Sequence, residues 1–129
     1  MANYSIKGGL TGAVVDTRWR TSTHGEDAAR PGQIAVSDFQ SLIGLVNEGY
    51  IPSGVALARK DGKLVPLGEG DTLYGFINDN EGVEVTPGDT YATIAVLRHG
   101  GIDPNFLPVE AQRDIVRDST NGNFFITEV

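Results

Sequence analysis

The sequence contains no cysteine, which excludes disulfide bonds and thiolate metal sites. No apolar run approaches the length of a membrane span, and the first ten residues lack the apolar segment of a secretory signal peptide. Basic residues are also scarce, because 10 Lys and Arg stand against 17 Asp and Glu and leave a net charge of −7. Nucleic acids and anionic membranes are bound through clustered basic side chains. We therefore expect a protein that is made in the cytoplasm and binds neither nucleic acid nor membrane.

Glycine, in contrast, is abundant, with 17 glycines among 129 residues. Gly8, Gly9 and Gly12 lie in a polar N-terminal segment that has too little apolar surface to form a core. The whole chain is 40% hydrophobic and 21% charged, which is a globular composition, and its length suits one domain. We predict a flexible N-terminal arm over residues 1–12 and a single β-rich domain over residues 13–129.

The prediction of the fold starts from residues 50–77, because they are a compact succession of turns and apolar runs. Pro52 and Gly54 are typical of a turn that leads into a strand over residues 55–59. Asp61-Gly62 separates that strand from its partner, and this pair favours a type I′ hairpin, which needs φ > 0 at both central positions. After a second turn, a third strand is predicted over residues 73–77.

Two further segments have strong strand patterns. Residues 13–21 alternate between apolar and polar side chains, which predicts a half-buried strand that carries Trp19. Residues 90–98 are apolar on both faces, which predicts a strand in the centre of a sheet or at an interface. Shorter strands are predicted over residues 33–36, 83–85 and 123–129, and His99-Gly100-Gly101 is predicted to break the strand before it.

Helical patterns are few. Residues 37–46 have apolar side chains at helical spacing, although a strand that continues to Phe39 is an alternative. The clearest helix is predicted over residues 109–118, where Pro108 fits the first turn. Many short strands with Gly-rich turns and one helix near the C-terminus indicate a mostly β domain, a small barrel or sandwich.

No group of residues has the pattern of a catalytic, cofactor or metal site. His24-Gly25-Glu26-Asp27 and His99 lack ligands or catalytic partners at a recognisable spacing. Residues 78–82 resemble a calcium loop only in part, because the twelfth position from Asn78 is Asp89 and not Glu, and the glycine is one place early. Trp19, flanked by Arg18 and Arg20, is either an aromatic anchor in a protein interface or a core residue. We therefore expect a protein that is not an enzyme and needs no cofactor.

Three groups of segments together resemble the head decoration proteins of tailed bacteriophages, particularly phages of actinobacteria, and more distantly the decoration protein of phage lambda. The first group consists of Arg18-Trp19, residues 22–25, Asp27-Ala28-Ala29 and Asp38-Phe39. The second, which is the most specific, consists of residues 49–57 with Ile51-Pro52-Ser53-Gly54, residues 62–67 and residues 73–77. The third consists of residues 97–100, residues 107–109 and Phe124-Phe125-Ile126. Residues 78–91 match no fixed pattern of the family.

The resemblance implies a β-tulip domain, usually a trimer, on the outer surface of the virion. It would bind the major capsid protein at threefold and quasi-threefold sites and stabilise the expanded head against the pressure of the DNA. We expect the capsid contacts to come from Tyr4, Ile6, Leu10, Arg18, Trp19 and Arg20. We expect the trimer interface to include Tyr50, Ile51, Pro52 and Leu97.

Two other functions are compatible with a small β domain. A trimeric nucleotide hydrolase would need a Gly-bounded Asp motif and phosphate-binding loops, and neither is recognisable. A carbohydrate-binding or tail-adaptor module of the virion would need several exposed aromatic side chains, and one Trp with 4 Tyr is a small supply.

Overall fold

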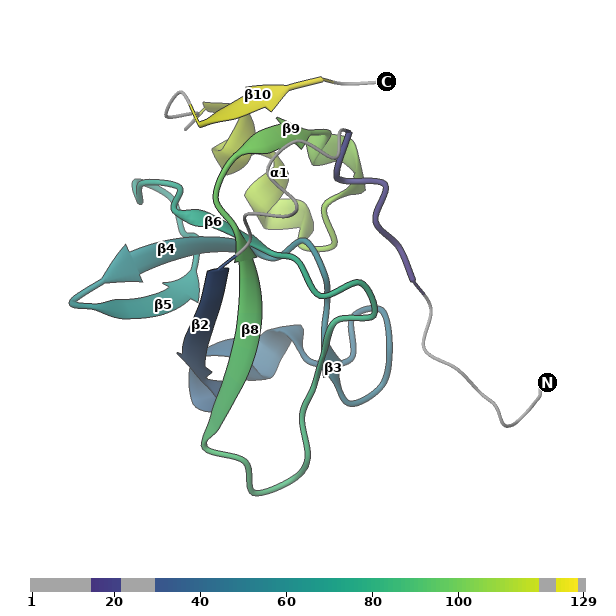
Figure 1. The fold of residues 1–129 in the computed structure, drawn as a ribbon, viewed down its shortest axis with the longest axis vertical. Helices are drawn as coiled ribbons and strands as arrows, with labels where there is room; N and C mark the ends of the chain where they lie inside the picture. Colours follow the sequence, from purple (N-terminus) through teal and green to yellow (C-terminus); the bar gives the residue numbers. More distant parts are fainter. Residues whose placement is uncertain (1–14, 22–29, 119–122, 128–129) are drawn as a thin grey trace, which may run out of the picture.

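The computed structural model describes residues 15–21, 30–118 and 123–127 (Figure 1). Its centre is a closed barrel of five strands, in the order β2 (Arg30–Ala35), β5 (Lys63–Pro66), β4 (Ala56–Lys60), β6 (Gly75–Ile77) and β8 (Tyr91–Leu97). β2 and β5 are parallel, and the other neighbours are antiparallel. The prediction of a mostly β, barrel-like domain is therefore confirmed. The predicted arm over residues 1–12 lies outside the described residues, and its separation from the domain stays a prediction.

The β4–β5 hairpin projects from the barrel at the left of Figure 1 and forms as its turn residues predict. Asp61 and Gly62 have φ angles of 52° and 78°, the positive values that a type I′ turn requires. Asp61 is also the one residue other than glycine with a positive φ among the described residues. The Asp-Gly pair thus sets the register in which Lys60 faces Lys63.

Two small sheets and the helices complete the domain. β3 (Tyr50–Ile51) pairs antiparallel with β7 (Val83–Glu84), and β9 (Gly100–Ile102) pairs parallel with β10 (Phe124–Ile126). The helices are the 3₁₀ helices η2 (Val36–Leu42) and η3 (Pro104–Phe106) and the α-helix α1 (Glu110–Asp118). In Figure 1, α1, β9 and β10 lie together above the barrel. The prediction of one short α-helix near the C-terminus is confirmed within the described residues.

Three local predictions differ from the structure. In the predicted strand over residues 13–21, the described part forms a turn, with Arg20 N–H bonded to Thr17 O, and Arg20 alone makes an isolated bridge to Ile102. The alternation there arises because Trp19 enters the core while its neighbours stay at the surface. Residues 36–42 are helical, but as a 3₁₀ helix. β8 ends at Leu97, just before the predicted break at His99, but a further strand, β9, begins at Gly100. This strand was not predicted, because two of its three residues are glycines.

Residues 56–58 of β4 and all of β6 are buried on both faces, so the domain has two cores. On β4, Leu57 points into the barrel, whereas Ala56 and Ala58 point outwards beneath α1, β9 and β10. The inner core, inside the barrel, consists of Ile34, Phe39, Leu42, Ile51, Val55, Leu57, Ile77, Val83, Ile94 and Val96. The outer core consists of Trp19, Ala56, Ala58, Leu67, Leu73, Phe76, Leu97, Ile102, Leu107, Val116 and Phe124. β8 buries Ile94 and Val96 on its inward face, but on its outer face only Leu97 is buried, so its apolar run corresponds to burial on both faces only near its end.

A buried glutamine fixes α1 on the barrel. Gln112 is 3% exposed, and its Oε1 accepts a hydrogen bond of 2.8 Å from the Ala56 backbone N–H. Its Nε2 donates to the carbonyl oxygens of Ala56 at 3.0 Å and Leu67 at 3.1 Å. The side chain therefore bonds the backbone where the β4–β5 pairing ends, since the Ala56 carbonyl also accepts from the Leu67 N–H and the next pair of residues already belongs to the ladder.

Candidate functional site

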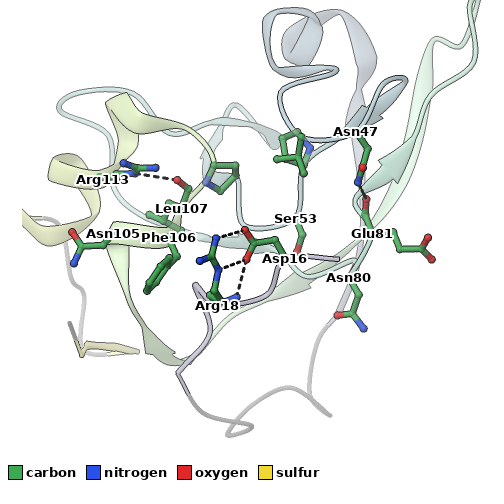
Figure 2. Close-up of a pocket in the computed structure, with 13 residues that line it drawn as sticks. Asp16, Arg18, Asn47, Ser53, Asn80, Glu81, Asn105, Phe106, Leu107 and Arg113 are labelled. Carbon is green, nitrogen blue, oxygen red and sulfur yellow. Dashed lines mark hydrogen bonds and ion pairs between the residues drawn. The ribbon is translucent and has the colours of Figure 1, made fainter. Parts of the chain in front are cut away.

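A pocket of about 140 Å³ lies where the N-terminal segment crosses the domain (Figure 2). Four segments line it, namely Asp16 and Arg18, residues 46–53, Asn80-Glu81, and residues 105–108 with Arg113. Two groups named from the sequence thus meet here, since Arg18 was expected to contact the capsid and Pro52 to form the trimer interface. The pocket joins the start of the described chain to the η3–α1 region.

The rim of the pocket carries a paired charge. Arg18 donates from Nε to Asp16 Oδ1 at 3.0 Å and from Nη2 to Asp16 Oδ2 at 2.9 Å. The Arg18 guanidinium also lies 4.5 Å from the centre of the Phe106 ring. These contacts hold the guanidinium in one place although the side chain is 67% exposed. A planar cation fixed at an exposed rim is suited to a polar partner surface.

The surroundings of Asp16 and Asp79 shift the pKa values of these two side chains in opposite directions. The hydrogen bond from Arg18 lowers the pKa of Asp16 below its ordinary value. Burial raises the pKa of Asp79, and the hydrogen bond from the Ala95 N–H, 3.0 Å long, offsets only part of that effect. The fold therefore favours the ionised form of Asp16 and the protonated form of Asp79.

These shifts predict opposite pH profiles for two asparagine variants. Asp79→Asn keeps an acceptor for Ala95 and removes the buried charge, so it should be more stable than the wild type near pH 7. That gain should disappear as the pH falls below the pKa of Asp79, where the wild-type carboxyl is itself neutral. Asp16→Asn should be less stable than the wild type near pH 7 and equal to it once acid protonates Asp16. Urea unfolding of the three proteins between about pH 3 and pH 7 checks both signs, and parallel profiles for the two variants would contradict them.

Arg20 anchors the turn that had a partial likeness to a calcium loop. Its guanidinium donates to Asn78 Oδ1 and, at 3.2 Å, to Asn80 Oδ1. Asp79 between them accepts the bond from Ala95. The oxygens of this turn are thus used to hold it against the N-terminal segment and β8. Arg20 therefore has a structural role in addition to any contact with a partner.

The structure corrects the expectation for Trp19, which is fully buried in the outer core and does not reach the surface. Its Nε1 donates to Ser53 Oγ at 3.3 Å, and Ser53 Oγ is 3.5 Å from the Ile77 carbonyl oxygen. Gly54 lies against the ring, because a Cβ placed there would be 2.8 Å from Trp19 Cδ1. Ser53-Gly54 therefore packs against the indole and bonds it, a role that the turn pattern alone did not indicate.

Three of the expected trimer-interface residues also need correction. Ile51 is fully buried in the inner core, Leu97 is 2% exposed in the outer core, and Pro52 is buried beside the pocket. Their apolar character therefore reflects packing within one chain. Tyr50 is half-buried and remains available to a neighbour. An aspartate in place of Leu97 would disrupt the domain itself and could not report on assembly.

The remaining expected contacts are divided. Tyr4, Ile6 and Leu10 lie outside the described residues, as do His24, Glu26 and Asp27. Arg18 lines the pocket, and Arg20, two residues on, is bonded to the turn over residues 78–80. No pattern in the sequence indicates Phe106 and Arg113, whose roles depend on tertiary contacts. Arg113 Nε donates to Leu107 O at 3.1 Å and so holds the η3–α1 connection that forms one wall (Figure 2).

Within the described residues, no helix is long and apolar enough to cross a membrane. Across the same residues, His, Asp and Glu side chains do not gather in a group of three or more that could hold a metal ion. Comparison with protein-family models, curated proteins and solved structures finds no match to this chain.

Proposed function

We propose that the chain is a decoration protein of a bacteriophage head, which binds the major capsid protein on the outer surface of the expanded shell and stabilises it, as a homotrimer. The observation that supports this proposal is the meeting of the three resembling segment groups in one place. Trp19 comes from the first group, Phe76 from the second, and Leu97, Leu107 and Phe124 from the third, and all five belong to the outer core.

The contacts between these groups are specific. The rings of Trp19 and Phe76 have centroids 5.5 Å apart, and those of Phe76 and Phe124 are 5.0 Å apart in an edge-to-face arrangement. The Ser53-Gly54 part of the most specific motif accommodates Trp19 of the first group. Motif residues that are far apart in sequence and depend on one another in space favour a common fold over chance similarity. The proposed function follows from this resemblance.

The proposed capsid contact begins at Arg18 and continues along the arm over residues 2–12. Arg18 is exposed at the pocket rim, and the described chain begins three residues before it at Val15. An extended arm can add main-chain hydrogen bonds to an exposed strand of a partner without requiring a particular side-chain pattern. The buried Trp19 fixes the base of this attachment in the domain.

Co-sedimentation with capsid shells tests the proposal. The purified chain should bind expanded shells of the major capsid protein and not unexpanded ones. Deletion of residues 2–12 should leave the melting temperature unchanged and weaken attachment by about tenfold or more, which corresponds to the loss of a few main-chain hydrogen bonds. Arg18→Gln should weaken it less, and Lys63→Gln, a matched loss of charge on the distant hairpin, should have no effect.

Failure of the full chain to bind expanded shells would refute the proposed function. Glycan binding without shell binding would instead favour a carbohydrate-binding module. Full attachment by the truncated chain would leave the function in place and show that the arm is not the contact.

A further inference from the structure

One end of the barrel has three arginines around its mouth. Along each strand, alternate side chains face the barrel interior. Arg30 therefore has the same orientation as Ile34 on β2, Arg59 the same as Leu57 on β4, and Arg98, just after β8, the same as Val96. Arg30 is paired with Val96, which places these strand ends side by side. Each arginine thus occupies the outermost inward position of its strand.

The mouth is hollow between these side chains. A recess of about 300 Å³ is lined by Arg30 and Arg59, with Tyr74 beside them and Leu64 and Val96 below. Gly32 lies where β2 passes this recess, and a Cβ there would meet Leu64 Cδ1 at 2.9 Å. The two apolar side chains therefore close the interior and form the floor, while the arginines stand at the rim.

Tyr74 orders part of this rim. The Arg98 guanidinium lies 3.8 Å from the centre of the Tyr74 ring, and its Nε donates to the Tyr74 carbonyl oxygen at 2.8 Å. The Arg59 guanidinium is 5.8 Å from the same ring. Guanidinium groups that stack on an aromatic ring keep their outer N–H donors available. The donors at the mouth are therefore held in place before any ligand arrives.

These arginines have no carboxylate partner among the described residues, which distinguishes them from three other cations of the domain. Among the described residues, Arg18 pairs with Asp16, Lys60 with Asp71 and Arg117 with Asp114. Within the same part of the chain, no ion pair involves Arg30, Arg59 or Arg98. Uncompensated like charges gathered in a recess are unfavourable alone and become favourable when an anion enters. This is unusual on a chain whose net charge is −7.

We propose that the barrel mouth formed by Arg30, Arg59, Arg98 and Tyr74 is a binding site for carboxylates of an acidic protein segment. The mouths of barrels are frequent ligand sites, and arginine forks match carboxylate geometry. Long polyanions such as nucleic acids would approach a chain of net charge −7 and be repelled along most of their length. Two or three carboxylates on a loop are attracted locally and interact little with the rest of the surface, because salt screens charges beyond about 8 Å. The inference stands apart from capsid binding.

A peptide titration tests the site. The full chain is titrated with a blocked hexapeptide of alternating aspartate and glutamate at an ionic strength of about 0.15 M, where charges beyond about 8 Å are screened, and amide chemical shifts are followed. We expect saturable binding, with shifts concentrated at the ends of β2, β4 and β8. The Arg30→Gln/Arg59→Gln variant should bind about tenfold more weakly, since hydrogen bonds to charged groups are lost. The Arg18→Gln/Arg117→Gln variant removes the same charge from residues that do not line the recess and should bind like the wild type.

A charge reversal gives a second test. The Arg30→Glu/Arg59→Glu variant should reject the acidic hexapeptide and bind a hexalysine peptide with shifts at the same strand ends. Absence of saturable binding by the wild type, or equal weakening in the two glutamine variants, would overturn the site. Tighter binding of inorganic phosphate or of a single-stranded oligonucleotide than of the acidic peptide would overturn the choice of ligand. No shell is present in these experiments, so their failure leaves the capsid proposal untouched.

Discussion

Gln112→Leu is expected to lower the free energy of unfolding by about 3 kcal/mol. Leucine fills a similar volume, but it leaves the buried N–H of Ala56 and the carbonyl oxygen of Leu67 without their partner. Each buried backbone group left unsatisfied costs about 1–3 kcal/mol. The loss should appear as a lower urea midpoint with an unchanged slope, because the surface buried on folding stays the same.

Gln40→Leu is the matched control for this substitution. Gln40 lies on η2 and is exposed, so the same chemical change there removes no buried hydrogen bond. Its effect should remain within about 0.5 kcal/mol, as for most surface substitutions. Equal stabilities of the two variants would show that Gln112 does not fix α1 through its hydrogen bonds.

Gly54→Ala is expected to destabilise the domain by about 3 kcal/mol for two reasons. The backbone of Gly54 has a φ of 92°, where a Cβ introduces strain of about 1–2 kcal/mol. The new Cβ would also press against the buried ring of Trp19, and overpacking of a core costs about 1–3 kcal/mol. Because Trp19 is the only tryptophan of the chain, its fluorescence in a denaturant titration reports both the stability and the displacement of the ring.

Gly88→Ala separates the two contributions to that loss. Gly88 has a similar φ of 97°, but nothing lies within 4 Å of a Cβ placed there. This variant should therefore lose only the strain energy and leave the emission of Trp19 unchanged. If the two alanine variants lose equal stability, Gly54 is required for its backbone conformation alone, and the space between Gly54 and the Trp19 ring is not tightly packed.

Local signals in the sequence were sufficient for much of the fold. Asp61-Gly62 specified its hairpin through backbone geometry, and the apolar run of β8 specified a central strand, which pairs with β2 and β6 in the barrel. β9 was not predicted, because glycines such as Gly100 and Gly101 have a low propensity for strands. It forms because the backbones of Thr21 and Phe124 lie on its two sides, with Thr21 N–H bonded to Gly101 O. Such pairing is tertiary and leaves no local pattern.

The site was less predictable than the fold. Trp19 between two arginines has the pattern of an exposed anchor, and only the space beside Gly54 shows that the ring turns inwards. The arginine mouth has no pattern at all, since Arg30, Arg59 and Arg98 are far apart in sequence and meet through barrel closure. Which charged side chains become neighbours depends on pairing between distant strands, and no local pattern in the sequence predicts that pairing.

The contacts among the rings of Trp19, Phe76 and Phe124 have a consequence for how the chain folds during synthesis. The outer core takes one residue from near the start of the described chain and another from near its end, with 104 positions between them. Contacts of such long separation close late, because chain entropy must be lost before they form. On the ribosome, the β4–β5 hairpin is complete long before β10 emerges. Until Phe124 leaves the exit tunnel, the outer core lacks the ring that packs against Phe76, so this half of the domain completes its packing only after β10 has emerged.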